Sequence, residues 1–81
     1  MIANEIIEKH LLQDPAVKYV KVEGDGHHYN LLIVSDVFLE KTKVLRQKWV
    51  YAQLKDYIKS GSLHALNMET WTNEEWESKR G

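Results

Sequence analysis

The sequence predicts an α+β fold in which helices cover one face of a small sheet. Three observations support this prediction: two segments carry apolar residues at helical spacing, three have the character of strands, and the two kinds do not alternate regularly along the chain. Regular alternation would favour repeated βαβ units, whereas a mixed order is typical of helices packed on one sheet. The expected order of elements is αββααβα, with three strands in one sheet.

The first part of the chain is typical of a helix followed by a β-hairpin. Residues 2–13 carry apolar side chains at helical spacing, and Asp14-Pro15 ends this segment because proline disfavours helix in the residue before it. Residues 19–23 alternate with period two, and residues 29–34 form a denser apolar run. The Gly24-Asp25-Gly26 segment between them has the composition of a turn, so the two strands should pair as a hairpin.

The middle of the chain is predicted to be helical. Ser35 or Asp36 can cap a short turn of helix. A longer helix is expected over roughly residues 43–59, and Gly61 should end it in the left-handed conformation. Its apolar stripe should pack with that of the first helix. The predicted shared stripe consists of Ile6, Ile7, Leu11, Val50, Leu54 and Ile58.

The last part of the chain is predicted to be a strand followed by a short helix. Residues 63–71 show a period-two pattern, and Thr72 and Glu75 have the spacing of a capping box. The third strand should lie beside one strand of the hairpin. The first helix and the long helix should pack together on one face of that sheet.

Length and composition limit what the chain can do. A chain of 81 residues is expected to be a single domain, residues 1–81, with a modest core and no deep substrate cavity. The formal net charge is −1, so there is no strong basic field that would indicate nucleic-acid binding. No apolar run approaches a membrane span and the N-terminus lacks a signal-peptide pattern, so a cytoplasmic location without membrane contact is expected.

The sequence indicates a protein that is not itself an enzyme. It lacks a paired-carboxylate motif, a serine or cysteine nucleophile signature and a phosphate-binding loop. It also contains no cysteine, so the chain can form no disulfide and can offer no thiolate to a metal.

Histidines are the side chains best able to carry site chemistry. His27 and His28 follow the Gly-Asp-Gly turn, where a polar hairpin loop is the simpler interpretation. A metal-facing loop is the alternative, because glycine allows close backbone approach and neutral imidazole suits iron. His64 opens the third strand, where a histidine with a satisfied hydrogen bond is the simpler interpretation. His10 is expected to be a surface residue of the first helix.

A basic segment spans the start of the long helix. It contains Lys41, Lys43, Arg46 and Lys48. Its default interpretation is a solvated helix face, and its alternatives are a surface for nucleic-acid phosphates or for an acidic partner.

Four short stretches, in this order, resemble the BolA family and in particular its short bacterial IbaG (YrbA) branch. Residues 22–29 (VEGDGHHY) are similar to the first hairpin of that branch, and residues 43–51 (KVLRQKWVY) to the basic helix of the family. Residues 63–66 (LHAL) resemble the His-Ala motif that opens the last strand. Residues 72–76 (TNEEW) resemble the Thr-Pro-x-x-Trp ending, with Asn73 where proline is common.

The resemblance implies an αββααβα fold akin to the class II KH domain. It also implies binding to a monothiol glutaredoxin, through a shared [2Fe-2S] cluster or in an apo complex, with roles in iron-sulfur trafficking and in iron and stress regulation. Some members are proposed to bind DNA, so a DNA-binding transcriptional regulator is the alternative function. The Gly-x-x-Gly clamp of KH domains is missing because no glycine lies between Gly26 and Gly61, which argues against single-strand binding of the KH type. Alone, the chain should be a monomer or weak homodimer without a cofactor.

The resemblance also implies which residues carry the function. His64 becomes the main candidate for an iron ligand, and His27 or His28 would supply the second contact, with a slight preference for His27 because His28 directly precedes the strand. Sulfur ligands would come from the active-site cysteine of the glutaredoxin and from glutathione, since this chain has no thiolate. The predicted nucleic-acid or partner surface consists of Lys43, Arg46 and Lys48.

Overall fold

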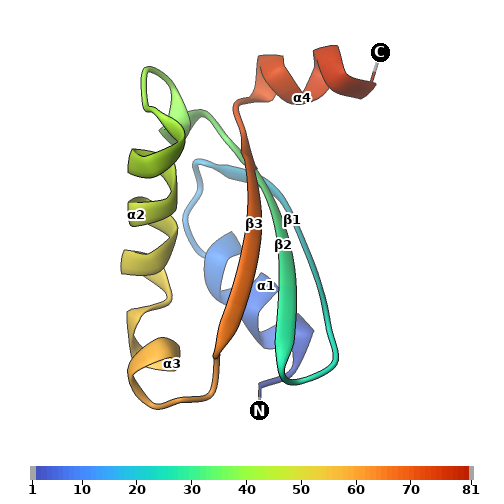
Figure 1. Cartoon of the computed structure of the whole chain (residues 1–81). Helices are drawn as coiled ribbons and strands as arrows, with labels where there is room; N and C mark the ends of the chain where they lie inside the picture. Colours follow the sequence, from blue (N-terminus) through green and yellow to red (C-terminus); the bar gives the residue numbers. More distant parts are fainter. Residues whose placement is uncertain (1, 81) are drawn as a thin grey trace.

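Four α-helices, one short 3-10 helix and a three-stranded sheet make up the computed structural model, which describes residues 2–80 (Figure 1). The order confirms the predicted α+β class, with η1 as the predicted short turn and the predicted long helix divided into α2 and α3. The elements are α1 (Asn4–Leu12), β1 (Val17–Gly24), β2 (His28–Ser35), η1 (Asp36–Phe38), α2 (Lys43–Gln53), α3 (Lys55–Lys59), β3 (Ala65–Trp71) and α4 (Asn73–Arg80).

The sheet has the order β1-β2-β3, with β2 in the centre. β1 and β2 pair antiparallel as the predicted hairpin, with Val22 opposite Leu31. β3 runs parallel to β2, with Met68 opposite Leu31, so the third strand joins one strand of the hairpin as predicted. A parallel neighbour requires a crossover connection, and η1, α2 and α3 form it.

One face of the sheet, covered by α1 and by the α2–α3 crossover, carries the main core. Alternate residues of a strand point to the same face, and on this face the strands contribute a continuous set of buried apolar side chains. The buried core side chains include Val20, Val22, Tyr29, Leu31 and Ile33 from the strands, Ile7 and Leu11 from α1, Phe38 from η1, and Val50, Leu54 and Leu63. Helices α1 and α2 therefore share one core, as predicted.

The first helix is shorter at both ends than predicted. Ile7 and Leu11 are buried as expected, but the prediction for Ile6 is wrong, since this side chain is 48% exposed. Ile2, which lies before the helix begins, is buried in the core instead. Its backbone accepts a hydrogen bond from the Tyr29 hydroxyl at 2.8 Å, so the buried phenol is satisfied.

The predicted long helix is interrupted. The backbone at Leu54 has φ −101° and ψ 12°, which separates α2 from α3. Val50 and Leu54 are buried as predicted, whereas the prediction for Ile58 is wrong: it is 38% exposed, and Tyr57 packs against the core after the break. Gly61 follows with φ +80°, as predicted for a glycine after a helix C-terminus.

The side chain of Ser35 caps η1. Its Oγ accepts a hydrogen bond from the backbone N–H of Val37 at 3.1 Å, which decides the predicted choice between Ser35 and Asp36. The Asp36 carboxylate instead accepts hydrogen bonds from the backbone N–H and the side-chain amide of Asn73, at 3.0 and 3.2 Å. Asp36 therefore ties the start of the crossover to the start of α4.

A carboxylate of α1 is bound to the hairpin edge. Glu8 Oε2 accepts a hydrogen bond from the backbone N–H of Val22 at 2.9 Å. β1 is an edge strand and its inner side pairs with β2, so this N–H points away from the sheet. Glu8 thus fixes α1 against the outer edge of β1.

Helix α4 covers one end of the opposite sheet face. Its Trp76 ring stacks on Tyr19 with a centroid distance of 6.1 Å and lies 6.4 Å from Trp71. Tyr19 and Trp71 flank Val34 across the three strands. Val34 is fully buried although it lies outside the main core cluster, so α4 adds a second, smaller apolar contact.

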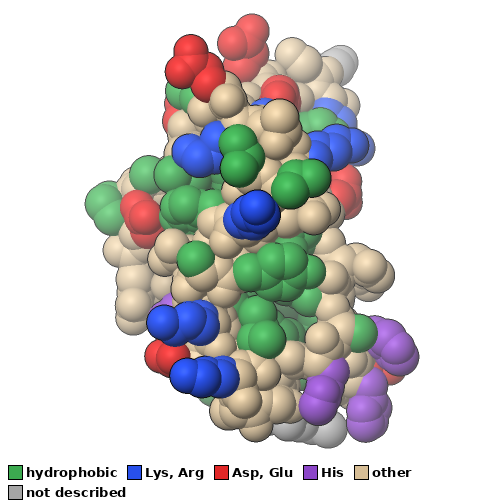
Figure 2. All heavy atoms as spheres, turned by 60° about the vertical axis from the view of Figure 1, so that its left-hand side comes forward, with side chains coloured by type: hydrophobic (Ala, Val, Ile, Leu, Met, Phe, Trp, Pro, Cys, Tyr) green, Lys and Arg blue, Asp and Glu red, His purple; other side chains and the backbone are tan. Residues whose placement is uncertain are grey.

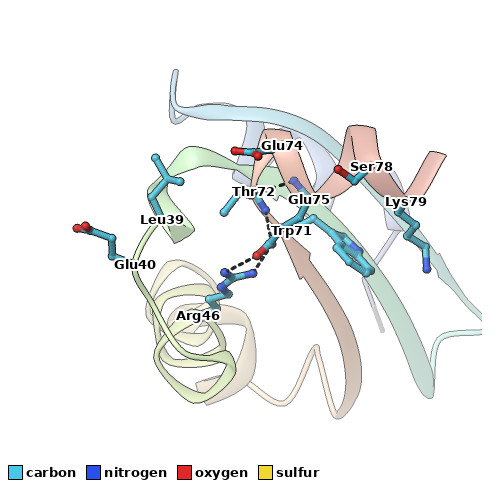
Figure 3. A pocket seen from close by; sticks show the side chains of 9 residues that line it. All are labelled: Leu39, Glu40, Arg46, Trp71, Thr72, Glu74, Glu75, Ser78 and Lys79. Carbon is cyan, nitrogen blue, oxygen red and sulfur yellow. Dashed lines mark hydrogen bonds and ion pairs between the residues drawn. The ribbon is translucent and has the colours of Figure 1, made fainter. Parts of the chain in front are cut away.

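The predicted capping box holds the start of α4. Thr72 Oγ1 accepts a hydrogen bond from the Glu75 backbone N–H at 3.2 Å, and Glu75 Oε1 accepts one from the Thr72 N–H at 2.9 Å. The same carboxylate makes a bidentate ion pair with Arg46 of α2, at 2.7 and 3.0 Å (Figure 3). Arg46 also donates to the carbonyl oxygens of Lys41 and Thr70, and so connects α2, β3 and α4.

This geometry corrects the prediction that Arg46 belongs to a nucleic-acid or partner surface. Its side chain is only 12% exposed, and its guanidinium is bound to one carboxylate and two backbone carbonyls. The Arg46 guanidinium, helped by the Thr72 N–H, lowers the pKa of Glu75 to about 2. A charged hydrogen-bond network of this kind stabilises the fold and commits four of the five N–H donors of Arg46, so little of its side chain remains for phosphate.

The core assignment predicts opposite outcomes for two neighbouring apolar residues. Leu54→Ala should lower the free energy of unfolding by about 2–5 kcal/mol, because it leaves a cavity at a fully buried position. Ile58→Ala, one turn further on and exposed, should change it by less than about 0.5 kcal/mol. Urea denaturation measures both, and equal losses would show that the break at Leu54 is wrongly placed.

The Arg46–Glu75 pair predicts an acid-dependent stability. In the folded protein the pKa of Glu75 is about 2, below its ordinary value of 4.5. Its contribution to the free energy of unfolding is therefore complete above pH 4.5 and is lost as the pH falls from 4.5 towards 2. Glu75→Gln should cost about 1–2 kcal/mol at neutral pH, an amount reduced by solvent screening because the Glu75 side chain is 42% exposed. The difference from wild type should shrink in that acid range. Glu74→Gln is the matched control, and a variant difference independent of pH would contradict the assignment.

Candidate functional site

The three predicted ligand histidines lie at the end of the sheet opposite α4. His28 opens β2, and its partner in β3 is Ala65, the residue after His64. His27 precedes β2 in the β1–β2 loop, and all three side chains are exposed. Figure 2 shows histidine side chains gathered at one end of the visible face. The hairpin turn and the start of β3 therefore bring these histidines to one end of the molecule.

Asp25 fixes the loop that carries two of these histidines. Its Oδ1 accepts hydrogen bonds from the backbone N–H groups of His27 and His28, at 2.9 and 3.0 Å, and its own N–H donates to the His28 carbonyl. Gly26 has φ +95°, a conformation that glycine adopts without strain. The N–H groups of His28 and His27 lower the pKa of the Asp25 carboxyl. The loop is thus a closed turn stabilised by its own aspartate.

The register distinguishes the two loop histidines. Tyr29 points into the core, so strand alternation places His28 on the open sheet face. His28 lies beside the start of β3, whereas His27 is at the turn. The register therefore places His28 next to the start of β3, and not His27, which the sequence slightly favoured, while the His64 ring lies near Gly61. Which histidine acts as a ligand stays a prediction.

His64 lies just before the third strand instead of within it. β3 begins at Ala65, so His64 is the last residue of the connection from α3. Within residues 2–80, no three or more His, Asp or Glu side chains are grouped closely enough to hold a metal ion.

The prediction that His10 is a surface residue is wrong, because its side chain makes structural contacts. It is half-buried, and its Nε2 donates to the backbone carbonyl of Gln53 at 2.6 Å. Its ring also meets Tyr57 edge-on at 5.3 Å. This contact joins α1 to the break between α2 and α3, and no sequence pattern predicted it.

The predicted basic surface is smaller than expected. Arg46 is withdrawn into its pair with Glu75, and Lys41 Nζ donates to the Val37 carbonyl at 2.6 Å. Lys43 and Lys48 remain exposed on α2. Two of the four predicted cations are therefore available to a partner.

Two open depressions flank the Arg46–Glu75 pair, one of them shown in Figure 3. Some of their charged side chains pair with one another: besides this pair, Lys79 lies 3.9 Å from Glu69 and 4.7 Å from the centre of the Trp71 ring. These contacts connect α2, β3 and α4. None of the helices within residues 2–80 has the length and apolar character needed to cross a bilayer.

Comparison with known proteins agrees with this architecture. A family model described as BolA-like protein matches residues 5–75. The acid stress protein IbaG of Escherichia coli strain K12 is 31% identical over 77 residues, covering 95% of this chain and 92% of IbaG. A bol-like protein from Babesia bovis superposes with a TM-score of 0.84 at 28% identity, covering 100% of this chain and 96% of that chain. The BolA domain of SufE1 from Arabidopsis thaliana gives a TM-score of 0.80 at 30% identity, covering 93% of this chain and 99% of that domain. The chain therefore belongs to the BolA-like protein family, as the order of its motifs predicted.

Proposed function

We propose that this chain is a non-enzymatic adaptor that binds a monothiol glutaredoxin and shares or transfers its [2Fe-2S] cluster, in iron-sulfur trafficking and in iron or stress regulation. The observation that carries the proposal is the β2–β3 register, which sets His28 beside the residue that follows His64. Membership of the BolA-like family supports it, and so does the description of one relative as an acid stress protein.

We call the end of the sheet that carries His27, His28 and His64 the histidine end. Its donor chemistry fits this role. Imidazole nitrogen is a good ligand for iron, and the chain offers no thiolate, so the histidines can contribute only one side of a shared site. His64 would bind iron together with His28 or, at the turn, His27. The glutaredoxin cysteine and glutathione would supply the sulfur ligands. Histidine in place of cysteine generally raises the reduction potential of such a cluster.

The scaffold around these residues suits an exposed half-site. His28 is held by strand pairing and by the Asp25 turn, and His64 is held by the strand that begins directly after it. Ligands fixed by rigid elements lose little entropy when a partner completes the site. All three histidines are exposed, so a docking protein can reach them without opening the core.

Histidine variants test the ligand assignment. Mixed with a [2Fe-2S]-loaded monothiol glutaredoxin, the chain should form a one-to-one complex, and His64→Ala should abolish the change in visible absorbance that accompanies binding. His28→Ala should weaken the change more than His27→Ala, because only His28 lies in the strand beside β3.

The controls separate folding from ligation. Circular dichroism should show that each variant keeps its fold, since all three histidines are exposed. If His64→Ala leaves the spectrum and the cluster lifetime unchanged, His64 is not a ligand. If wild-type protein does not bind the loaded glutaredoxin at all, the proposed function itself is wrong.

DNA binding is the second candidate, favoured by the exposed Lys43 and Lys48. With Arg46 committed to Glu75, few phosphate contacts remain, so we expect weak non-specific binding with a Kd of roughly 10⁻⁴–10⁻⁶ M. Lys43→Ala and Lys48→Ala should each reduce the slope of log affinity against log salt by about 0.9, as measured by fluorescence anisotropy. A sequence-selective nanomolar complex that tolerates salt would place this function first.

A further inference from the structure

The outer face of α2 and α3 carries exposed apolar side chains at regular spacing. Val44, Tyr51 and Ile58 are seven residues apart and are 59%, 43% and 38% exposed. Seven residues make about two helical turns, so Val44 and Tyr51 lie on the same side of α2. Ile58 continues the series across the break into α3. We call this surface the α2–α3 face; it consists of Val44, Lys48, Tyr51, Lys55, Ile58 and Lys59.

Both helices contribute to a hollow on this face. Tyr51 from α2 and Ile58 from α3 line it with the stems of Lys55 and Lys59, and its surface is almost wholly apolar. Long lysine side chains commonly cover apolar surface with their methylene groups while the charge stays in water. Figure 2 turns this side of the molecule forward and shows Lys and Arg side chains spaced down it, with apolar side chains between them.

The lysines of these two helices lack partners inside the structure. Within residues 2–80, Lys43, Lys48, Lys55 and Lys59 make no ion pair and no side-chain hydrogen bond. Residues 43–59 contain a single acidic residue, Asp56. Apart from Lys9, the other cations contact a carboxylate or a carbonyl oxygen: Lys18, Lys21, Lys41, Arg46, Lys79 and Arg80. Unpaired positive charge is thus concentrated on helices α2 and α3 of a nearly neutral protein.

The pattern of charge and apolar surface identifies the kind of occupant. Lys48 and Lys55 alternate with the apolar residues along one line, so an occupant must offer acidic and apolar groups in alternation. An amphipathic helix does this, with apolar side chains seven apart and carboxylates between them. A DNA backbone has no apolar side group that could fill the hollow at Tyr51 and Ile58. A bilayer would draw the interleaved lysines towards its apolar layer.

We propose that the α2–α3 face docks an acidic amphipathic helix of a partner protein. The apolar side chains of that helix would meet Val44, Tyr51 and Ile58, and its carboxylates would meet Lys48, Lys55 and Lys59. Opposite charges of this kind speed association and fix register, while the apolar contacts supply most of the affinity. The proposal does not depend on cluster ligation, because none of these residues belongs to the histidine end.

A designed peptide probes this surface. The probe is a fluorescein-labelled helix of three heptads with leucine at a and d and glutamate at e and g, and its control has the same composition with the leucines scattered around the helix. Only the patterned peptide should bind, and its amide shift changes in the ¹⁵N-labelled protein should concentrate on residues 43–59. Tyr51→Ala with Ile58→Ala, or Lys48→Glu with Lys55→Glu, should weaken binding roughly tenfold or more. Ile6→Ala with Leu12→Ala, exposed apolar residues of α1, is the matched control and should leave it unchanged.

Every other result counts against the proposal. Equal binding of both peptides would show that the face attracts negative charge without recognising an amphipathic helix. Absence of binding by the patterned peptide would show that the face is no helix-docking site. Duplex DNA and vesicles of phosphatidylserine and phosphatidylcholine are titrated in parallel. If either shifts residues 43–59 while the patterned peptide does not, the occupant is nucleic acid or lipid.

Discussion

The parallel pairing of β3 with the central strand β2 is the constraint on which the rest of the structure depends. Because the two strands point the same way, the chain must return along the length of the sheet between them, and η1, α2 and α3 make that return. The return packs Val50 and Leu54 onto the core face. The same register brings His64 beside the hairpin turn. Core packing and the position of the histidine end thus have one cause.

The two ends of the sheet differ in how their polar groups are satisfied. At the α4 end, Arg46, Glu75 and Thr72 satisfy one another, and Asp36 binds the first residue of α4. At the other end, the hydrogen bonds of Asp25 serve the backbone of the loop and leave the imidazoles exposed. The first end therefore holds elements together, and the second presents exposed imidazoles, the ligands of the proposed function. This division agrees with an adaptor whose chemistry is completed by another molecule.

Local signals in the sequence predicted most of the fold. The hairpin, the Thr72 capping box and the glycine after α3 depend on residues close together in the chain, and all were predicted. The Arg46–Glu75 pair joins residues 29 positions apart, so helix periodicity alone presented Arg46 as a surface cation. Periodicity also assumed one straight helix, which is why the break at Leu54 and the exposure of Ile58 were missed. The loop histidines stood out from their Gly-Asp-Gly turn, whereas His64 became the main candidate only by resemblance to a family. All three lie at one end of the sheet because of the parallel register, which no local pattern encodes.

The contact between Glu8 and Val22 affects how the β1 edge of the sheet can meet other chains. A free strand edge is a template for adding further strands, and natural proteins protect such edges against aggregation. Here the carboxylate occupies an outward N–H of β1 and α1 lies against that strand, so a foreign strand would have to displace a charged group to pair there. The protection comes from a helix side chain, in a strand whose register with β2 shifts between Val17 and Tyr19. A small sheet can therefore include a long edge strand whose outer edge is not open to pairing with strands of other molecules.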